Sequence, residues 1–144
     1  ERERETPIGI GLSLTVSRSR EPMDHNPKFL ARVDQARVGI CECTVDEVIQ
    51  AKNEGESFTL IDVREESEFA AGRIPGAIHV SKGVIERDIE SVIPDQDERL
   101  ILYCGGGYRS AIAAESLVAM GYTNVTSMDG GWRGWRDAEQ PVER

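Results

Sequence analysis

The sequence predicts one α/β domain in which a five-stranded, mainly parallel sheet has helices on both faces. Three observations predict this class. The 144 residues are the size of a single domain with one sizeable core. Five short apolar runs occur along the chain, and patterns of helical period stand between most of them. Strands that are joined through helices run parallel and are covered on both faces, so a buried sheet is expected.

The five strands are expected at residues 39–43, 58–63, 77–80, 100–103 and 125–127. Helices are expected at residues 27–38, 45–55, 65–71, 83–92, 111–120 and 132–138. Local signals define several of the ends: Thr44 and Glu47 form a capping box, and Gly72 and Gly121 each follow a helix. The helix at 111–120 is apolar nearly all round, which predicts that it is buried.

Residues 1–23 differ from the rest of the chain. Four arginines and four glutamates cancel within residues 1–22, so the whole net charge lies on the remainder. Residues 12–16 alternate well enough to form an edge strand. No apolar segment with a cleavage site follows a basic end, so no secretory signal is expected. We expect residues 1–23 to be a flexible extension, or one foreign to the native chain, and residues 24–144 to be the folded domain.

The chain is acidic. It has 17 Lys and Arg against 26 Asp and Glu, a net charge of −9, with 39% apolar and 30% charged residues. This balance is that of a globular protein and offers no electrostatic footprint for nucleic acid or for an anionic membrane. No apolar run approaches the roughly 18–20 residues of a membrane span. We therefore expect a cytoplasmic protein that has neither nucleic acid nor membrane as a partner.

Residues 102–110, Leu-Tyr-Cys-Gly-Gly-Gly-Tyr-Arg-Ser, carry the clearest chemical signal. A buried strand ends at Cys104, three glycines follow, and a helix begins within a few residues. The glycines permit a tight loop whose amides turn inward as an anion-binding nest, and the helix adds partial positive charge. A cysteine at the mouth of such a nest is expected to be a thiolate and a nucleophile, with Arg109 as a cation nearby.

Two other interpretations fit parts of the same loop. A free cysteine is often an inert buried thiol, and glycines often only make a turn; the combination of loop, arginine and helix start favours function. Gly105 to Ser110 also nearly fits the dinucleotide fingerprint, with Asp129 lying 22 residues after Gly107. Ser110 replaces the third glycine, however, and that fingerprint normally follows the first strand of a larger domain.

The loop from Cys104 to Ser110 resembles the active-site loop of the rhodanese (sulfurtransferase) family. The likeness extends to other segments of the chain in the right order and spacing. These segments are Asp62-Val63-Arg64 with Glu68, Phe69 and Gly72; Ile74-Pro75-Gly76-Ala77-Ile78; and Asp129-Gly130-Gly131-Trp132 with Trp135. The resemblance covers about residues 43–138 and implies a rhodanese-like fold with a five-stranded, mainly parallel sheet.

The resemblance implies a ping-pong reaction. The Cys104 thiolate takes the outer sulfur of a small anionic donor such as thiosulfate, and the amides of Gly105 to Ser110 hold the persulfide. A thiophilic acceptor, which is cyanide in an assay or a cellular thiol, then removes the sulfur; a protein acceptor is an open alternative. No cofactor and no metal are implied. Four residues separate Cys104 from Arg109; the related cell-cycle phosphatases have a loop one residue longer, so the length favours sulfur transfer over phosphatase chemistry.

The substrate-binding residues expected from the resemblance are Gly105, Gly106, Gly107, Tyr108, Arg109 and Ser110. Asp62, Arg64 and Glu68 are expected to support the loop, the first two as ion-pair partners. Arg109 could contact the donor or be tied to an acid, and Tyr108 could line the pocket or pack on the surface. Thiosulfate enzymes of the family place a basic residue within the loop, which this chain does not; Lys82 or Arg87 could supply that charge from outside.

The remaining cysteines, Cys41 and Cys43, fall on one face of the expected strand, where a disulfide between them would be strained. His25 and His79 show no zinc-ligand spacing. We expect both thiols to serve packing; either could react with a Cys104 persulfide only if the fold brought it close. Trp132 and Trp135 are expected to close the core. A non-enzymatic persulfide carrier or protein-binding module stays the main functional alternative, and a phosphatase the lesser one.

Overall fold

The computed structural model describes residues 25–144, and the sheet and the site lie within residues 32–144. Its strands are β1 (Cys41–Cys43), β2 (Thr59–Asp62), β3 (Ile78–His79), β4 (Leu100–Tyr103) and β5 (Val125–Met128). Its helices are α1 (Pro27–Arg37), α2 (Val45–Asn53), α3 (Glu66–Ala71), the short 3-10 helix η2 (Lys82–Val84), α4 (Ile85–Val92), α5 (Tyr108–Ala119) and α6 (Gly131–Asp137).

All five strands pair in parallel, in the order β1-β5-β4-β2-β3. The predicted α/β class and five-stranded sheet are therefore confirmed, and the sheet is wholly rather than mainly parallel. Strand β4 lies between β5 and β2, with Asp62 beside Tyr103 and Leu102 beside Ser127. In a parallel sheet the carboxyl ends of the strands meet at one edge, where ligands bind. Cys104 follows β4 at this edge.

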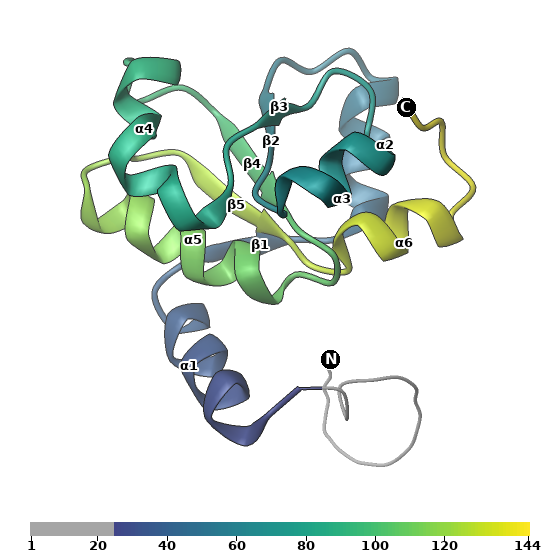
Figure 1. Ribbon diagram of the computed structural model, residues 1–144. Coiled ribbons are helices and arrows are strands. Elements are labelled where there is room, and N and C mark those ends of the chain that lie inside the picture. Colours follow the sequence, from purple (N-terminus) through teal and green to yellow (C-terminus); the bar gives the residue numbers. More distant parts are fainter. Residues whose placement is uncertain (1–24) are drawn as a thin grey trace. The chain divides into compact units, whose positions relative to one another are not determined.

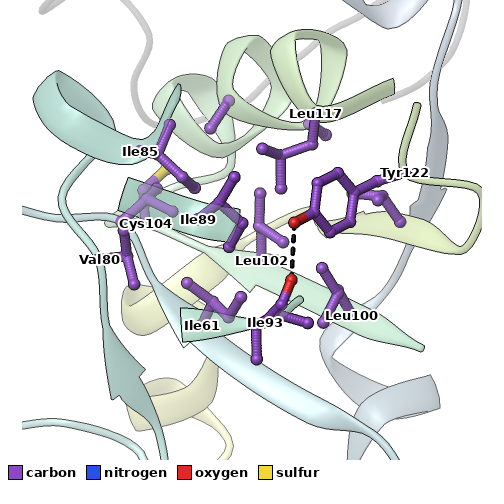
Figure 2. Packing of buried hydrophobic residues seen from close by; sticks show 14 residues of the cluster. Ile61, Val80, Ile85, Ile89, Ile93, Leu100, Leu102, Cys104, Leu117 and Tyr122 are labelled. Carbon is purple, nitrogen blue, oxygen red and sulfur yellow. Dashed lines mark hydrogen bonds between the residues drawn. The ribbon is translucent and has the colours of Figure 1, made fainter. Parts of the chain in front are cut away.

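One face of the sheet packs against α4 and α5 (Figure 1). Leu100 and Leu102 of β4 point to this face because alternate residues of a strand share a side. Figure 2 shows the resulting cluster, in which the Tyr122 hydroxyl donates a hydrogen bond of 2.6 Å to the Ile93 carbonyl. Cys104 is a member of this cluster, so its side chain lies on the α4/α5 face.

The other face packs against α2 and α6 (Figure 1). Ile101 and Tyr103 of β4 point to this side, with Trp135 of α6 only 1% exposed among them. The Trp135 indole N–H donates to the Pro141 carbonyl at 2.8 Å, so its one polar atom is satisfied. Trp132 is half-buried and packs against the same cluster. The two tryptophans close this side of the core, as predicted.

Most predicted element ends agree with the structure. The Thr44 hydroxyl accepts from the Glu47 N–H at 3.1 Å and the Glu47 carboxylate accepts from the Thr44 N–H at 2.8 Å, which confirms the capping box. Gly121 follows α5 with φ +103°, a conformation that favours glycine. The predictions for residues 1–23, including an edge strand at 12–16, lie outside the described residues.

Helix α5 differs from its prediction in two respects. It begins at Tyr108 rather than Ala111, because Gly107 takes a left-handed conformation (φ +101°) and reverses the chain one residue earlier. Only one of its faces is buried: Val118 is 43% exposed although Leu117 is fully covered. The apolar residues of this segment therefore exceed what the sheet can cover. Within residues 25–144, no helix combines the length and the apolar character that crossing a membrane requires.

Candidate active site

Cys104 lies between the end of β4 and the start of α5, and its side chain is 1% exposed. The Gly107 N–H donates to its Sγ at 3.2 Å and the Ser110 N–H donates at 3.3 Å. The thiol also lies 3.5 Å from the Ser110 hydroxyl, to which it donates. Backbone N–H groups that converge on sulfur stabilise negative charge there, and the N-terminus of α5 adds to this effect. The loop is thus suited to a nucleophilic sulfur.

The loop holds further donors around this sulfur. Among the residues that the structure describes, no acceptor takes the backbone N–H groups of Gly105, Gly106 and Arg109. Unpaired amides in a loop of this kind form a nest for an anion. They are available to a negatively charged group attached to Cys104 or placed beside it.

The segment that begins at Asp129 fixes the loop from outside. The Trp132 N–H donates to the Cys104 carbonyl at 2.7 Å and the Arg133 N–H donates to the Gly105 carbonyl at 3.0 Å. A third bond joins the Gly130 N–H to the Gly106 carbonyl at 3.2 Å. These bonds engage the loop's carbonyl groups and leave its N–H groups for the sulfur. The Asp-Gly-Gly-Trp motif, which the sequence indicated only through its resemblance, therefore has a structural role in the loop.

Arg109 is bound to an acid. Its two terminal nitrogens lie 2.8 and 3.2 Å from the two carboxylate oxygens of Glu68 in α3, so the pair is bidentate. The hydrogen bonds that Arg109 donates lower the pKa of Glu68 although partial burial opposes them, and the same bonds raise the pKa of Arg109. The sequence left open whether Arg109 contacts the donor or pairs with an acid; in the structure it pairs with an acid, Glu68.

Asp62 and Arg64 form a buried ion pair at 2.7 Å, with both side chains at most 3% exposed. Arg64 also donates to the Gly72 carbonyl at 2.7 Å. Burial works to lower the pKa of Arg64, but the hydrogen bonds and charge of Asp62 outweigh it and raise that pKa. The pair lies on the α2/α6 face, because Asp62 is beside Tyr103 in the sheet. It shares the edge of the sheet with Cys104 but not the face.

The Asp62–Arg64 ion pair is connected to the loop through Trp132. The Arg64 guanidinium carbon lies 4.8 Å from the centroid of the Trp132 ring. The backbone N–H of Trp132 is the group that holds the Cys104 carbonyl. Glu68 forms its ion pair with Arg109, and its negative charge also helps to raise the pKa of Arg64.

Arg37, at the end of α1, contacts the active-site loop, which the sequence did not indicate. Its guanidinium lies 3.4 Å from the Gly107 carbonyl, to which it donates, and 3.6 Å from a carboxylate oxygen of Asp129. It also lies 5.2 Å from the centre of the half-buried Tyr108 ring and pairs with Glu42 at 3.1 Å. No local pattern links Arg37 to a loop 70 residues later, so only the packing of the helix reveals it.

The two basic residues proposed as external charges, Lys82 and Arg87, lie outside the loop. Arg87 is exposed in α4 and forms an ion pair with Asp88 at 2.7 Å. Lys82 lies in η2, where its backbone N–H donates to the Val63 carbonyl at 2.9 Å. Within residues 25–144, the side chain of neither residue hydrogen-bonds to residues 104–110.

Cys41 and Cys43 lie on the α2/α6 face, because their partners in the parallel pairing are Thr126 and Met128 of β5. Cys104 is on the opposite face. Burial raises the pKa of Cys43 to about 12, and the charge of Glu47 contributes. Cys43 is half-buried and packs against the cluster on this face, as expected, whereas Cys41 is exposed, so the expectation of a packing role is wrong for Cys41. The structure thus separates both thiols from the sulfur of Cys104, and no group of metal-ligating side chains occurs within the described residues.

Comparison with known proteins agrees with this arrangement. The model of the rhodanese-like domain matches residues 44–138. Thiosulfate sulfurtransferase GlpE of Glaesserella parasuis is 32% identical over 90 residues, which cover 62% of this chain and 82% of that protein.

Two solved structures are also similar. One is a protein of unknown function from Rhodopseudomonas palustris, described as a possible tyrosine phosphatase; it has a TM-score of 0.74 and 30% identity, over 92% of this chain and 100% of that one. The other is a thiosulfate sulfurtransferase from Pseudomonas aeruginosa, with a TM-score of 0.71 and 26% identity, over 81% of this chain and 22% of that one. Since the family model spans most of the chain and includes the loop, the chain belongs to the rhodanese-like domain family.

Proposed function

We propose that this protein is a sulfurtransferase that carries a sulfane sulfur as a persulfide on Cys104. One observation carries the proposal. The Cys104 sulfur accepts hydrogen bonds from two backbone N–H groups, and three further N–H groups of the loop have no acceptor among residues 25–144. The first pair stabilises the attacking thiolate. The free amides are positioned for the added sulfur, whose negative charge would otherwise be poorly solvated at a buried site.

In the first half-reaction the Cys104 thiolate attacks the outer sulfur of the donor. With thiosulfate, the new sulfur–sulfur bond forms as the old one breaks, and sulfite leaves with the bonding electrons. The product is Cys–S–S⁻, and the total charge is unchanged. In the second half-reaction cyanide or a thiolate attacks the terminal sulfur and the Cys104 thiolate is released, as nucleophilic catalysis requires. A side chain that is 1% exposed favours donors whose reacting sulfur is terminal and slender.

The loop disfavours phosphoryl transfer, the activity suggested by the description of the Rhodopseudomonas palustris relative. A phosphoryl group carries three oxygens that need donors in its plane, and an arginine is the usual bidentate partner for them. Here both terminal nitrogens of Arg109 are bound to Glu68. A loop with four residues between Cys104 and Arg109 is also narrow for that group.

Intact-protein mass spectrometry tests the proposal. Incubation with thiosulfate is expected to add the mass of one sulfur atom, cyanide to remove it with formation of thiocyanate, and Cys104→Ser to abolish the addition. Cys41→Ser is the matched control and is expected to keep it, because Cys41 lies across the sheet. A persulfide that forms from a protein donor but does not turn over with cyanide would identify a carrier. Hydrolysis of a chromogenic phosphate ester that requires Cys104 would overturn the proposal.

A further inference from the structure

The guanidinium of Arg133, in α6, lies over the active-site loop at Gly106. A Cβ built on Gly106 would stand 3.1 Å from Nη1 and 3.9 Å from Cζ of Arg133. The glycine therefore leaves the space that the guanidinium occupies. The backbone of Arg133 is fixed at the same place, because its N–H donates to the Gly105 carbonyl at 3.0 Å. The side chain thus projects over the loop from a residue that is itself bonded to it.

Arg133 differs from the other arginines around the loop in its charge balance. Each of the others has a carboxylate partner: Arg109 with Glu68, Arg64 with Asp62, and Arg37 with Glu42 and Asp129. The Arg133 side chain is exposed and makes no ion pair or hydrogen bond with any other described residue. Arg133 is therefore a positive charge over the loop that no carboxylate within residues 25–144 compensates.

We propose that Arg133 binds the anionic group of the sulfur donor. This inference rests on the proposed function and names the class of donor: a small oxyanion, such as thiosulfate or a thiosulfonate, whose terminal sulfur faces Cys104. The sulfonate oxygens then lie at the outer rim of the loop, where the guanidinium fork and the free Gly106 N–H donate to them. When the sulfur–sulfur bond breaks, the same donors receive the negative charge of the leaving sulfite.

The position of this charge accounts for the composition of the loop. The loop has glycine, not a basic residue, at 105, 106 and 107. A Cβ at Gly106 would crowd Nη1 of Arg133 at 3.1 Å, so glycine lets the cation supplied from α6 lie directly against the loop. The chain as a whole has a net charge of −9, which repels a dianion at long range. A local, uncompensated cation is therefore needed for a donor of this class.

Arg133→Gln tests the inference, with Arg136→Gln as the matched control. Arg136 lies on the same helix, is exposed, and its guanidinium lies against the Trp132 ring. The rate of Cys104 persulfide formation per molar thiosulfate is expected to fall about ten- to a hundredfold in Arg133→Gln, the range for loss of a hydrogen bond between charged groups. It is expected to stay within about twofold in Arg136→Gln, since exposed charges away from a site contribute little. Arg133→Lys, which keeps the charge, is expected to recover part of the loss.

Donor charge provides a second readout. In Arg133→Gln, the rate of persulfide formation is expected to fall less with a monoanionic aryl thiosulfonate than with the dianion thiosulfate. The charge of Arg133 interacts with one negative charge in the first donor and with two in the second. An equal loss for both donors, or an Arg133→Gln rate equal to that of Arg136→Gln, would overturn the inference and leave the Cys104 persulfide intact.

Binding without reaction separates this inference from the proposed function. In the Cys104→Ser background, calorimetry is expected to show thiosulfate binding that Arg133→Gln weakens about tenfold or more. If the wild-type protein formed no persulfide with any donor, the proposed function would fail, and the calorimetric comparison would still decide the role of Arg133. Equal thiosulfate affinities with and without Arg133→Gln, or no thiosulfate binding at all, would overturn the inference.

Discussion

A methyl group at Gly131 would lie 2.3 Å from the carbonyl oxygen of Cys104, far inside van der Waals contact. Gly131 also has φ +51°, in the left-handed region. The close approach exists because the segment from Gly130 to Arg133 donates three backbone hydrogen bonds to the loop. Glycine at this position is therefore part of how the nucleophile is held, although α5 and β5 lie between Cys104 and Gly131 in the sequence.

Gly131→Ala is expected to lower the free energy of unfolding by about 3 kcal/mol or more, because backbone strain and a backbone clash coincide. Urea denaturation followed by circular dichroism measures the change. Gly39→Ala is the matched control: a Cβ there meets no atom within 4 Å, so a change of less than about 1 kcal/mol is expected. Equal stabilities of the two variants would show that the loop is not held by this contact.

Ser127 is expected to stabilise the fold through Ser110. The two hydroxyl oxygens lie 2.8 Å apart and both side chains are fully buried. Ser127→Ala leaves the Ser110 hydroxyl without this partner, at a cost of about 1–3 kcal/mol in the free energy of unfolding. The double variant Ser110→Ala/Ser127→Ala removes both hydroxyls, so its decrease in free energy of unfolding is expected to be smaller than the sum of the decreases in the two single variants. Additive losses in this cycle, measured by urea denaturation, would show that the two hydroxyls are not coupled.

The Glu68–Arg109 pair predicts a pH-dependent contribution to stability. The hydrogen bond from Arg109 lowers the pKa of Glu68 in the folded state, so the contribution is complete above the unfolded pKa of about 4.3 and is lost as the pH falls through the folded pKa. Both side chains are about a third exposed, and solvent screening keeps the effect to about 1 kcal/mol or less. The difference in free energy of unfolding between wild type and Glu68→Gln is therefore expected to be largest near pH 7 and to decrease as the pH falls below the unfolded pKa.

Glu66→Gln, on the same helix, is the control for that measurement, because Glu66 has no arginine partner among the described residues. A difference from wild type that persists unchanged at pH 3 would mean that Glu68 acts through packing rather than through its charge. Activity provides a further distinction: loosening the Arg109 tie is expected to slow persulfide formation without abolishing it, since Cys104 keeps its N–H donors from Gly107 and Ser110.

Signals carried by neighbouring residues were sufficient to predict most of the fold. The capping box at Thr44 and the glycine after α5 depend on contacts within a few residues, and both agree with the structure. The start of α5 was placed three residues late, because its first turn consists of Tyr108, Arg109 and Ser110, which interrupt the apolar pattern. Those residues begin the helix because the loop, rather than the core, determines where it starts.

Contacts between distant segments could not be predicted in the same way. The family resemblance includes both the Cys104 loop and residues 129–132, but it does not predict the three hydrogen bonds between them, because these depend on how the chain passes from β5 to α6. The placement of Arg133 over Gly106 and of Arg37 beside Gly107 depends on helix packing that no local pattern encodes. Asp62 and Arg64 are expected from the sequence to be ion-pair partners, but the face of the sheet on which they lie follows from the register of β2 with β4.

Cys43 is expected to resist alkylation in the folded protein. Burial raises the pKa of Cys43 to about 12, so only about one thiol in ten thousand is ionised at pH 8, and the thiolate is the reactive form. Cys41, two residues away, is exposed. In a Cys104→Ser background, iodoacetamide at pH 8 is expected to modify Cys41 much faster than Cys43, as measured by peptide mass spectrometry over time.

Unfolding in urea is the control that separates burial from the effect of neighbouring residues. Once burial is lost, Cys41 and Cys43 share nearly the same sequence surroundings, and their alkylation rates are expected to converge. Rates that already agree in the folded protein would contradict the buried, neutral state of Cys43. Because β1 places Cys43 across the sheet from Cys104, slow alkylation would also mean that this thiol takes no sulfur from a Cys104 persulfide. The acceptor in the second half-reaction is then a group other than Cys43.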